Sequence, residues 1–349
     1  MGKYTIISDG KKVNMFDKEL GVDLSLKNYI LNYHFSSIVN KVGLFVTADD
    51  SVAVSELENY FEKIPLLGFK GPIIFIQISK NFISTDDIAK YIYHIEERDN
   101  ILKAIYYDDY LYISDGIVNK INKGFHFAEI KYKEIFDLKN FFPYLIKIIE
   151  GLIIENHLKL GFFPIHSSLI GCEDDECILI MGNSQSGKTT TARLFCNTGK
   201  YKMLSDDIAF IDSTGLAYPY GQYIKIINNN KTGIFNEQIT YDNLTIYREI
   251  YKISNLYKPY KIKCIILPQI MFINKSECFR LSEKDIGKIS IPLLSEYPNK
   301  WFVYSEYNFI LGYQVMCLLE KIPFYQINLK FQSDNKEITK LWEDQCITL

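Results

Sequence analysis

The chain lacks a strong excess of charge of either sign. Its 39 Lys and Arg residues nearly balance 42 Asp and Glu residues, which leaves a formal net charge of −3 over 349 residues and a pI near 6.0. A nucleic-acid-binding domain normally carries a strongly basic face. We therefore expect no nucleic-acid partner.

Long apolar runs are also missing. The most apolar stretch, residues 140–158, is interrupted by Lys147, Glu150 and Glu155 and predicts an amphipathic helix rather than a membrane span. The first residues alternate like a strand and lack the apolar core of a signal peptide. Ile6 stands where an N-myristoylation signal needs Ser or Thr. These features predict a cytoplasmic protein with no membrane partner.

The seven cysteines are scattered along the chain, and their odd number argues against a secreted disulfide framework. Cys172 and Cys177 flank an Glu-Asp-Asp-Glu run that is typical of a hairpin tip, and no second Cys/His pair lies nearby in sequence. Two ordinary thiols are favoured there over a metal site. With 48% hydrophobic and 23% charged residues, the composition is globular and allows one large or two ordinary domains.

Residues 1–135 predict a smaller N-terminal α+β domain with a recognition or scaffold role. Asp-Gly pairs between β-type runs predict hairpins near residues 5–16 and 111–122. Helices are expected over 51–64 and 84–98, with a buried strand over 71–79. No catalytic constellation is visible in this part.

Residues 136–349 predict an α/β nucleotide-binding domain. A helix over 138–158 precedes the strand-like runs 161–171 and 177–181, a glycine loop, a short helix and a further strand over 201–212. This order of strand, glycine loop, helix and strand is typical of P-loop proteins.

The glycine loop "GNSQSGKTT" fills every fixed position of the motif G-x-x-x-x-G-K-[ST]. Glycine lets the backbone approach phosphates, and successive N–H groups at a helix N-terminus bind the anion. Lys188 is expected to reach the β- and γ-phosphates and Thr189 to bind Mg²⁺. The predicted nucleotide-binding residues are Gly182, Asn183, Ser184, Gln185, Ser186, Gly187, Lys188, Thr189 and Thr190.

A carboxylate pair follows the loop. Asp206 and Asp207 lie 18 and 19 residues after Lys188, near the end of a predicted strand. In P-loop folds such a strand lies beside the loop strand, and a bend at its end can aim both carboxylates inward. One carboxylate is then expected to hold Mg²⁺ and the other to accept a hydroxyl proton. A solvated acidic turn is the alternative.

His166 lies 16 residues before Gly182, where a hairpin partner of the loop strand should begin. A histidine on an apolar strand is usually a packing residue. Because His166 lies near a predicted phosphate site, contact with phosphate or metal is as well supported as a packing role.

Together, the runs "IHSSLI", "ILIMGNSQSGKTTTARLF", "KMLSDDIAFID" and "AYPYGQYIKI" resemble the HPr kinase/phosphorylase family, and most of all the HPr-kinase-like proteins of bacterial peptide-modification clusters. The resemblance covers roughly residues 150 to 228. It implies the α/β fold that HPr kinase shares with PEP carboxykinase, ATP and Mg²⁺ as cofactors, and possible homo-oligomers.

The resemblance carries roles over residue by residue. Lys188 and Thr189 match the loop residues that hold phosphate and Mg²⁺, and His166 matches the active-site histidine. Asp207 matches the base and Asp206 the metal-side carboxylate, although these two roles are open to exchange. All of Asp207, His166, Lys188 and Asp206 are therefore candidate catalytic residues, and Thr189 and Asp206 are candidate metal ligands.

Two family features are missing. The stretch "YGQYIKIINNNKTGIF" has no glutamate where the family has a metal-binding one, and Arg248 is no more than a candidate for the catalytic arginine. Kinase activity alone is therefore the expectation, without the reverse phosphorylase reaction. The expected acceptor is a serine side chain of a precursor peptide or protein. A small alcohol or free serine, a nucleotide-gated scaffold without phosphoryl transfer, and a weaker carboxykinase-like activity stay open, as does the preference for ATP or GTP.

The stretch 247–263 is rich in tyrosine and lysine. The candidates for contacting an acidic peptide or the phosphates of a nucleotide are Arg248, Lys252, Lys258, Lys261 and Lys263. A solvated helix and linker is the favoured interpretation of this stretch.

Overall fold

The computed structural model divides the chain into two compact units, residues 1–156 and 157–349. This division falls within helix α3 (Leu138–Lys159), whereas the sequence suggested one after residue 135. Among the described residues, no helix has both the length and the apolar character needed to cross a bilayer. The structure describes residues 33–61, 66, 69–80, 92–98, 101–106, 109–114, 117–122, 124–132, 138–183, 185–220, 223–228, 236–241, 244–252, 258–286, 288, 306–330, 337 and 340–341.

The first unit contains an eight-stranded mixed sheet in the order β1-β2-β3-β8-β7-β6-β5-β4. Strands β2, β3 and β8 are parallel to one another, and every other neighbouring pair is antiparallel. The strands are β1 (Tyr33–Val39), β2 (Val42–Ala48), β3 (Ile73–Ser79), β4 (Ile92–Arg98), β5 (Ile101–Tyr106), β6 (Asp109–Ser114), β7 (Ile117–Asn122) and β8 (Phe127–Tyr132).

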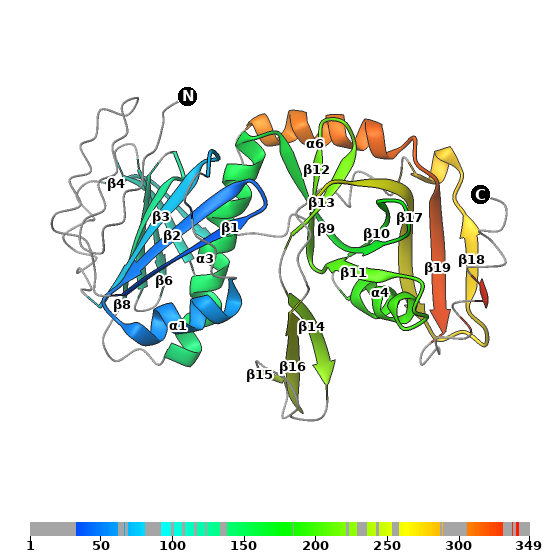
Figure 1. Cartoon of the computed structure of the whole chain (residues 1–349), viewed down its shortest axis with the longest axis horizontal. Coiled ribbons are helices and arrows are strands. Elements are labelled where there is room, and N and C mark those ends of the chain that lie inside the picture. Colours follow the sequence, from blue (N-terminus) through cyan, green and yellow to red (C-terminus); the bar gives the residue numbers. More distant parts are fainter. Residues whose placement is uncertain are drawn as a thin grey trace. The chain divides into compact units, whose positions relative to one another are not determined.

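Helices α1 (Ser51–Tyr60) and α3 lie against this sheet (Figure 1). Asp50 caps α1 by accepting a hydrogen bond from the Val52 N–H at 2.8 Å, and the Tyr60 hydroxyl donates to Glu150 of α3. From Ile148 to Leu158 only Glu150 is not buried, so α3 is confirmed as a helix but is far less amphipathic than its sequence suggested.

Several sequence predictions for the first unit are confirmed. The helix at 51–60, the fully buried strand at 73–79 and the hairpin formed by β6 and β7 are all present. The helix predicted over 84–98 is wrong for its second half, because Ile92–Arg98 forms β4 and pairs with β5. Isoleucine and tyrosine favour a strand once a partner strand is available, so tertiary pairing overrides the capping signal. Residues 84–91 and the hairpin expected near 5–16 lie outside the described residues.

The second unit is built on a mixed sheet whose strands β10, β17 and β19 run parallel. The path β10-β9-β12-β13-β17 closes on itself because β10 also pairs with β17, and β19 and β18 extend it beyond β17. The strands are β9 (Phe162–Gly171), β10 (Glu176–Met181), β11 (Lys202–Ser205), β12 (Ile208–Asp212), β13 (Leu216–Pro219), β17 (Tyr260–Met271), β18 (Glu277–Arg280) and β19 (Phe324–Lys330).

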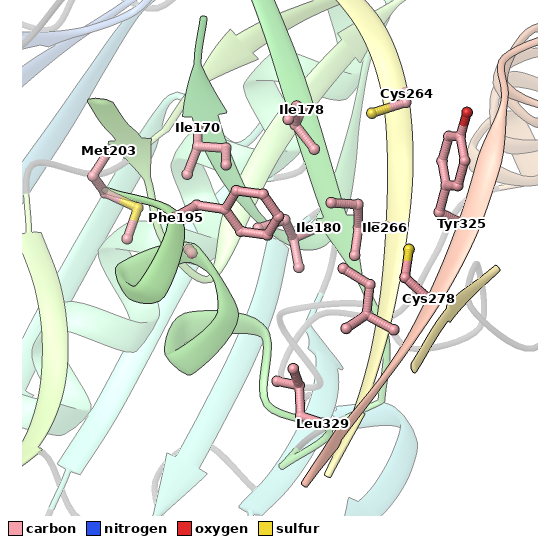
Figure 2. Close-up of a cluster of buried hydrophobic side chains, with 12 residues drawn as sticks. Ile170, Ile178, Ile180, Phe195, Met203, Cys264, Ile266, Cys278, Tyr325 and Leu329 are labelled. Atoms are coloured by element: carbon pink, nitrogen blue, oxygen red, sulfur yellow. The ribbon is translucent and has the colours of Figure 1, made fainter. Parts of the chain in front are cut away.

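Two helices pack on opposite faces of β9. Helix α4 (Lys188–Cys196) buries Ala192 and Phe195 against the sheet, and Figure 2 shows Phe195 pointing toward the isoleucines of the strands beneath it. Gly312 of α6 (Glu306–Leu319) lies so close to Phe163 that a side chain there would collide with the ring. The cluster under α4 consists of Ile170, Ile178, Ile180, Ala192, Phe195, Met203, Cys264, Ile266, Cys278, Tyr325, Ile327 and Leu329.

A separate three-stranded antiparallel sheet comprises β14 (Tyr223–Asn228), β16 (Leu244–Lys252) and β15 (Asn236–Tyr241). The helix considered for residues 247–263 is therefore wrong: the stretch ends β16 and begins β17. The fold is mixed α/β, as the sequence predicted.

Candidate functional site

The glycine loop joins the end of β10 to the start of α4, as the motif predicts. Gly182 and Gly187 have φ angles of 153° and 100°, values that favour glycine. A Cβ on Gly182 would lie 2.5 Å from the Ser186 hydroxyl oxygen, and one on Gly187 would lie 2.9 Å from Ile270 Cγ1. The loop conformation therefore requires glycine at both positions. Ser184 lies outside the described residues.

The Lys188 side chain is buried and curls back over the loop. Its Nζ donates to the carbonyl oxygens of Gly182 at 2.7 Å and Asn183 at 2.9 Å. The Ser186 hydroxyl oxygen is buried and has no hydrogen-bond partner among the residues described. A buried polar atom without a partner is costly, so a ligand that reaches it gains a hydrogen bond. The loop thus brings together the Lys188 ammonium group and the unbonded Ser186 hydroxyl.

Thr189, at the start of α4, meets Asp206 across the site. The Thr189 hydroxyl lies 3.0 Å from Asp206 Oδ1 and 3.1 Å from Oδ2. Ser168 of β9, which is fully buried, donates to Asp206 Oδ1 at 2.6 Å. The carboxylate is therefore held by hydroxyls from two different elements.

Asp206 is only 5% exposed. Burial raises its pKa to about 6, and the neighbouring charge of Asp207 acts in the same direction, while the hydrogen bonds from Ser168 and Thr189 oppose the rise. A buried carboxylate with a raised pKa next to a second carboxylate is typical of a functional site. A bound cation would favour its ionised form.

Asp207 occupies a strained turn between β11 and β12. Its φ angle is +68°, and the Ile208 N–H donates to the Asp206 carbonyl at 2.9 Å across it. This pattern is a γ-turn with a left-handed central residue, which is rare and strained. The Asp207 carbonyl also accepts a hydrogen bond from the Ser167 N–H at 3.2 Å. Strain of this kind is concentrated at functional sites.

His166 lies on the same strand as Ser168. Because alternate residues of a strand share a face, His166, Ser168 and Ile170 all lie on the face that α4 covers. His166 is half-buried and pairs in register with Ile208, next to the Asp207 turn. The hairpin of β9 with β10, expected from sequence, is present.

One expectation about this region is wrong. The strand ending at Asp206 was expected beside the loop strand, yet β11 and β12 both pair with β9. The neighbours of β10 are β9 and β17, so β9 separates the loop strand from the Asp-Asp segment.

Three of the lysines considered for substrate binding contact the acidic hairpin tip, and the side chain of Lys252 lies outside the described structure. Lys258 pairs with Asp175, and Lys261 and Lys263 pair with Glu176 at 3.5 and 3.6 Å. Cys172 and Cys177 are free thiols, and among the described residues no group of three or more His, Cys, Asp or Glu side chains is arranged to hold a metal. Arg248 lies on β16, and its side chain is outside the described structure.

Sequence reasoning overlooked Ser168 and Ile270. The step of two residues from His166 to Ser168 was the available signal for Ser168, because it places both side chains on one face of a strand. Ile270 had no such signal, because its contact with Gly187 depends on the parallel pairing of β17 with β10. In comparison with known proteins, no family model and no curated protein matches the chain.

Proposed function

We propose that the protein is an ATP- and Mg²⁺-dependent kinase that transfers the γ-phosphoryl group to a serine hydroxyl of a peptide or protein. The observation that carries this proposal is the meeting of Lys188, Thr189 and Asp206 at the start of α4, with Asp207 adjacent. The resemblance of residues 150–228 to HPr-kinase-like proteins points to the same chemistry.

The residues of the site fit a triphosphate and a magnesium ion. Lys188 would exchange the Gly182 and Asn183 carbonyls for phosphate oxygens, and the buried Ser186 hydroxyl would gain a partner. A carboxylate and a hydroxyl are the oxygen ligands that Mg²⁺ prefers, and Asp206 and Thr189 supply them 3.0 Å apart. When bound, the ion would neutralise charge on the phosphates.

Asp207 is proposed to accept the proton of the acceptor hydroxyl. The acceptor oxygen then forms a bond to the γ-phosphorus while the bond to the β-phosphate oxygen breaks, and ADP leaves. Because Asp206 is engaged by Ser168 and Thr189, Asp207 is the carboxylate assigned to the base. Lys188 stabilises charge on the transferring group, and His166, on the same strand face as Ser168, is assigned to phosphate contact.

The test is mass spectrometry of serine-containing peptides and proteins encoded beside the gene, and of free serine, after incubation with ATP and Mg²⁺. The expected result is a mass gain of one phosphoryl group on a peptide, lost in Lys188→Ala and Asp207→Asn. Lys200→Ala, which removes an exposed lysine after α4, is the matched control and should keep the activity.

Other outcomes separate the alternatives. Asp207→Asn should still bind ATP, because it removes the base and leaves the phosphate loop intact. Phosphorylation of free serine alone would indicate a small-molecule kinase. ADP formation or ATP binding without any phosphorylated acceptor would support a nucleotide-gated scaffold and contradict the kinase proposal.

A further inference from the structure

We propose that Ser168 is a positioning residue that orients Asp206 for binding of the metal–nucleotide complex. This inference rests on the proposed function and assigns a role to a residue outside the glycine loop and the Asp-Asp pair. It concerns how one carboxylate oxygen is selected for the metal.

Thr189 alone does not select that oxygen. Its hydroxyl lies 3.0 Å from Oδ1 and 3.1 Å from Oδ2 of Asp206, so the contact is almost the same for both. A contact shared in this way does not distinguish one oxygen from the other. The metal would then meet two oxygens with the same contact to Thr189.

Ser168 removes this ambiguity. Its hydroxyl lies 2.6 Å from Asp206 Oδ1, and no contact with Oδ2 accompanies it. A short hydrogen bond to an ionised group is among the stronger ones in proteins. Because Ser168 engages Oδ1 in addition to the contact with Thr189, Oδ2 is the oxygen assigned to the metal.

The position of Ser168 is rigid. Its side chain is fully buried, and β9 is paired with β10 at Ile180 and with β11 and β12 along its length. Outer partners that orient a metal ligand typically change metal affinity by about 10- to 100-fold when removed. A hydroxyl on a strand held from both sides meets the requirements of such a partner.

Ser167 provides a matched control within the same strand. It is equally buried, but its side chain faces away from α4 and donates to the Ile165 carbonyl of its own strand at 3.2 Å. Ser167→Ala and Ser168→Ala therefore remove the same atom from neighbouring positions. Only the second removes a donor to Asp206.

The experiment is calorimetric titration of the full-length protein with ATP, once with excess Mg²⁺ and once with EDTA. For Ser168→Ala we expect the Kd of MgATP to rise about 10- to 100-fold, while the Kd of metal-free ATP stays that of the unsubstituted protein. Ser167→Ala should change neither value. Ser168→Cys, which replaces the hydroxyl with a larger thiol that is a weak donor, should give an intermediate MgATP affinity.

Two results would overturn the inference alone. Unchanged MgATP affinity in Ser168→Ala would show that the hydroxyl orients nothing. An equal loss of affinity with Mg²⁺ and with EDTA would show a general structural role. If the unsubstituted protein binds no ATP under either condition, the proposed function itself is wrong and the inference fails with it.

Discussion

At the scale of single residues, Asp206 combines burial with a neighbouring negative charge. Both features disfavour its ionised form and raise its pKa, and only the hydroxyls of Ser168 and Thr189 and one backbone hydrogen bond act against them. Without a ligand, the ionised side chain therefore costs folding stability. A cation bound beside it would convert the same group into a stabilising one.

This leads to a prediction for Asp206→Asn. The folded-state pKa of about 6 lies above the ordinary value of 3.8, so stability is highest below that ordinary value and is lost as the pH rises toward and through 6. The substitution should remove this loss and stabilise the ligand-free protein at pH 7.5 by up to about 3 kcal/mol. Urea unfolding between pH 4 and 8 measures it.

The control for this prediction is Glu173→Gln, which neutralises an exposed carboxylate at the β9–β10 tip. It should leave the pH profile of stability unchanged. If Asp206→Asn destabilises the protein at pH 7.5, the carboxylate is a net stabilising group in the ligand-free state, and the assignment made here is wrong.

At the scale of elements, the glycine loop is fitted against β17. Gly187 is the N-cap residue of α4 and has a φ angle of 100°, and its missing side chain leaves room for Ile270 of β17. Gly199, just after α4, has a φ angle of 78°, but a Cβ there would meet nothing within 4 Å. A substitution at Gly199 therefore adds backbone strain alone, whereas a substitution at Gly187 adds backbone strain and a steric collision.

We expect Gly187→Ala to destabilise the protein by about 0.5–1.5 kcal/mol more than Gly199→Ala, because both add strain but only the first forces a side chain, that of the part-exposed Ile270, away from its rotamer. Adding Ile270→Ala removes the two atoms that collide and should recover most of the difference. The coupling energy follows from the free energies of unfolding of the unsubstituted protein, Gly187→Ala, Ile270→Ala and the double variant. Equal costs for the two glycine substitutions would contradict the tight fit.

The sequence predicted elements well where the local signal was strong. The glycine loop, its strand, α4 and the partner strand carrying His166 follow from motif spacing and alternation. The position of Asp206 relative to β10 does not, because which strand pairs with which depends on contacts distant in sequence. The same reason explains β4, where a helix-like pattern was overridden by pairing with β5.

At the scale of the whole molecule, the residues of the candidate site all belong to the second unit, residues 157–349. Compact units of this kind open separately when few contacts join them. A ligand bound to one unit then protects mainly that unit.

Hydrogen exchange with and without MgATP measures this effect. At a ligand concentration of about 100 times Kd, amides of β9, β10 and α4 should gain protection equivalent to about 2.7 kcal/mol. Amides of β1, β2 and β3 should exchange at unchanged rates, and Lys188→Ala should abolish the gain. Equal protection in both units would show that they open as a single cooperative body.

The adjacent serines of β9 have a consequence for mutational robustness. Successive side chains of a strand point to opposite faces of the sheet. A one-residue shift of β9 would therefore exchange the faces of Ser167 and Ser168. A shift that carries Ser167 into the place of Ser168 would still put a serine opposite Asp206, whereas the opposite shift would put Leu169 there. His166 would turn to the other face in both cases. The serine pair therefore keeps a hydroxyl beside the carboxylate after one of the two shifts, so single-residue insertions in β9 should affect the role of His166 first.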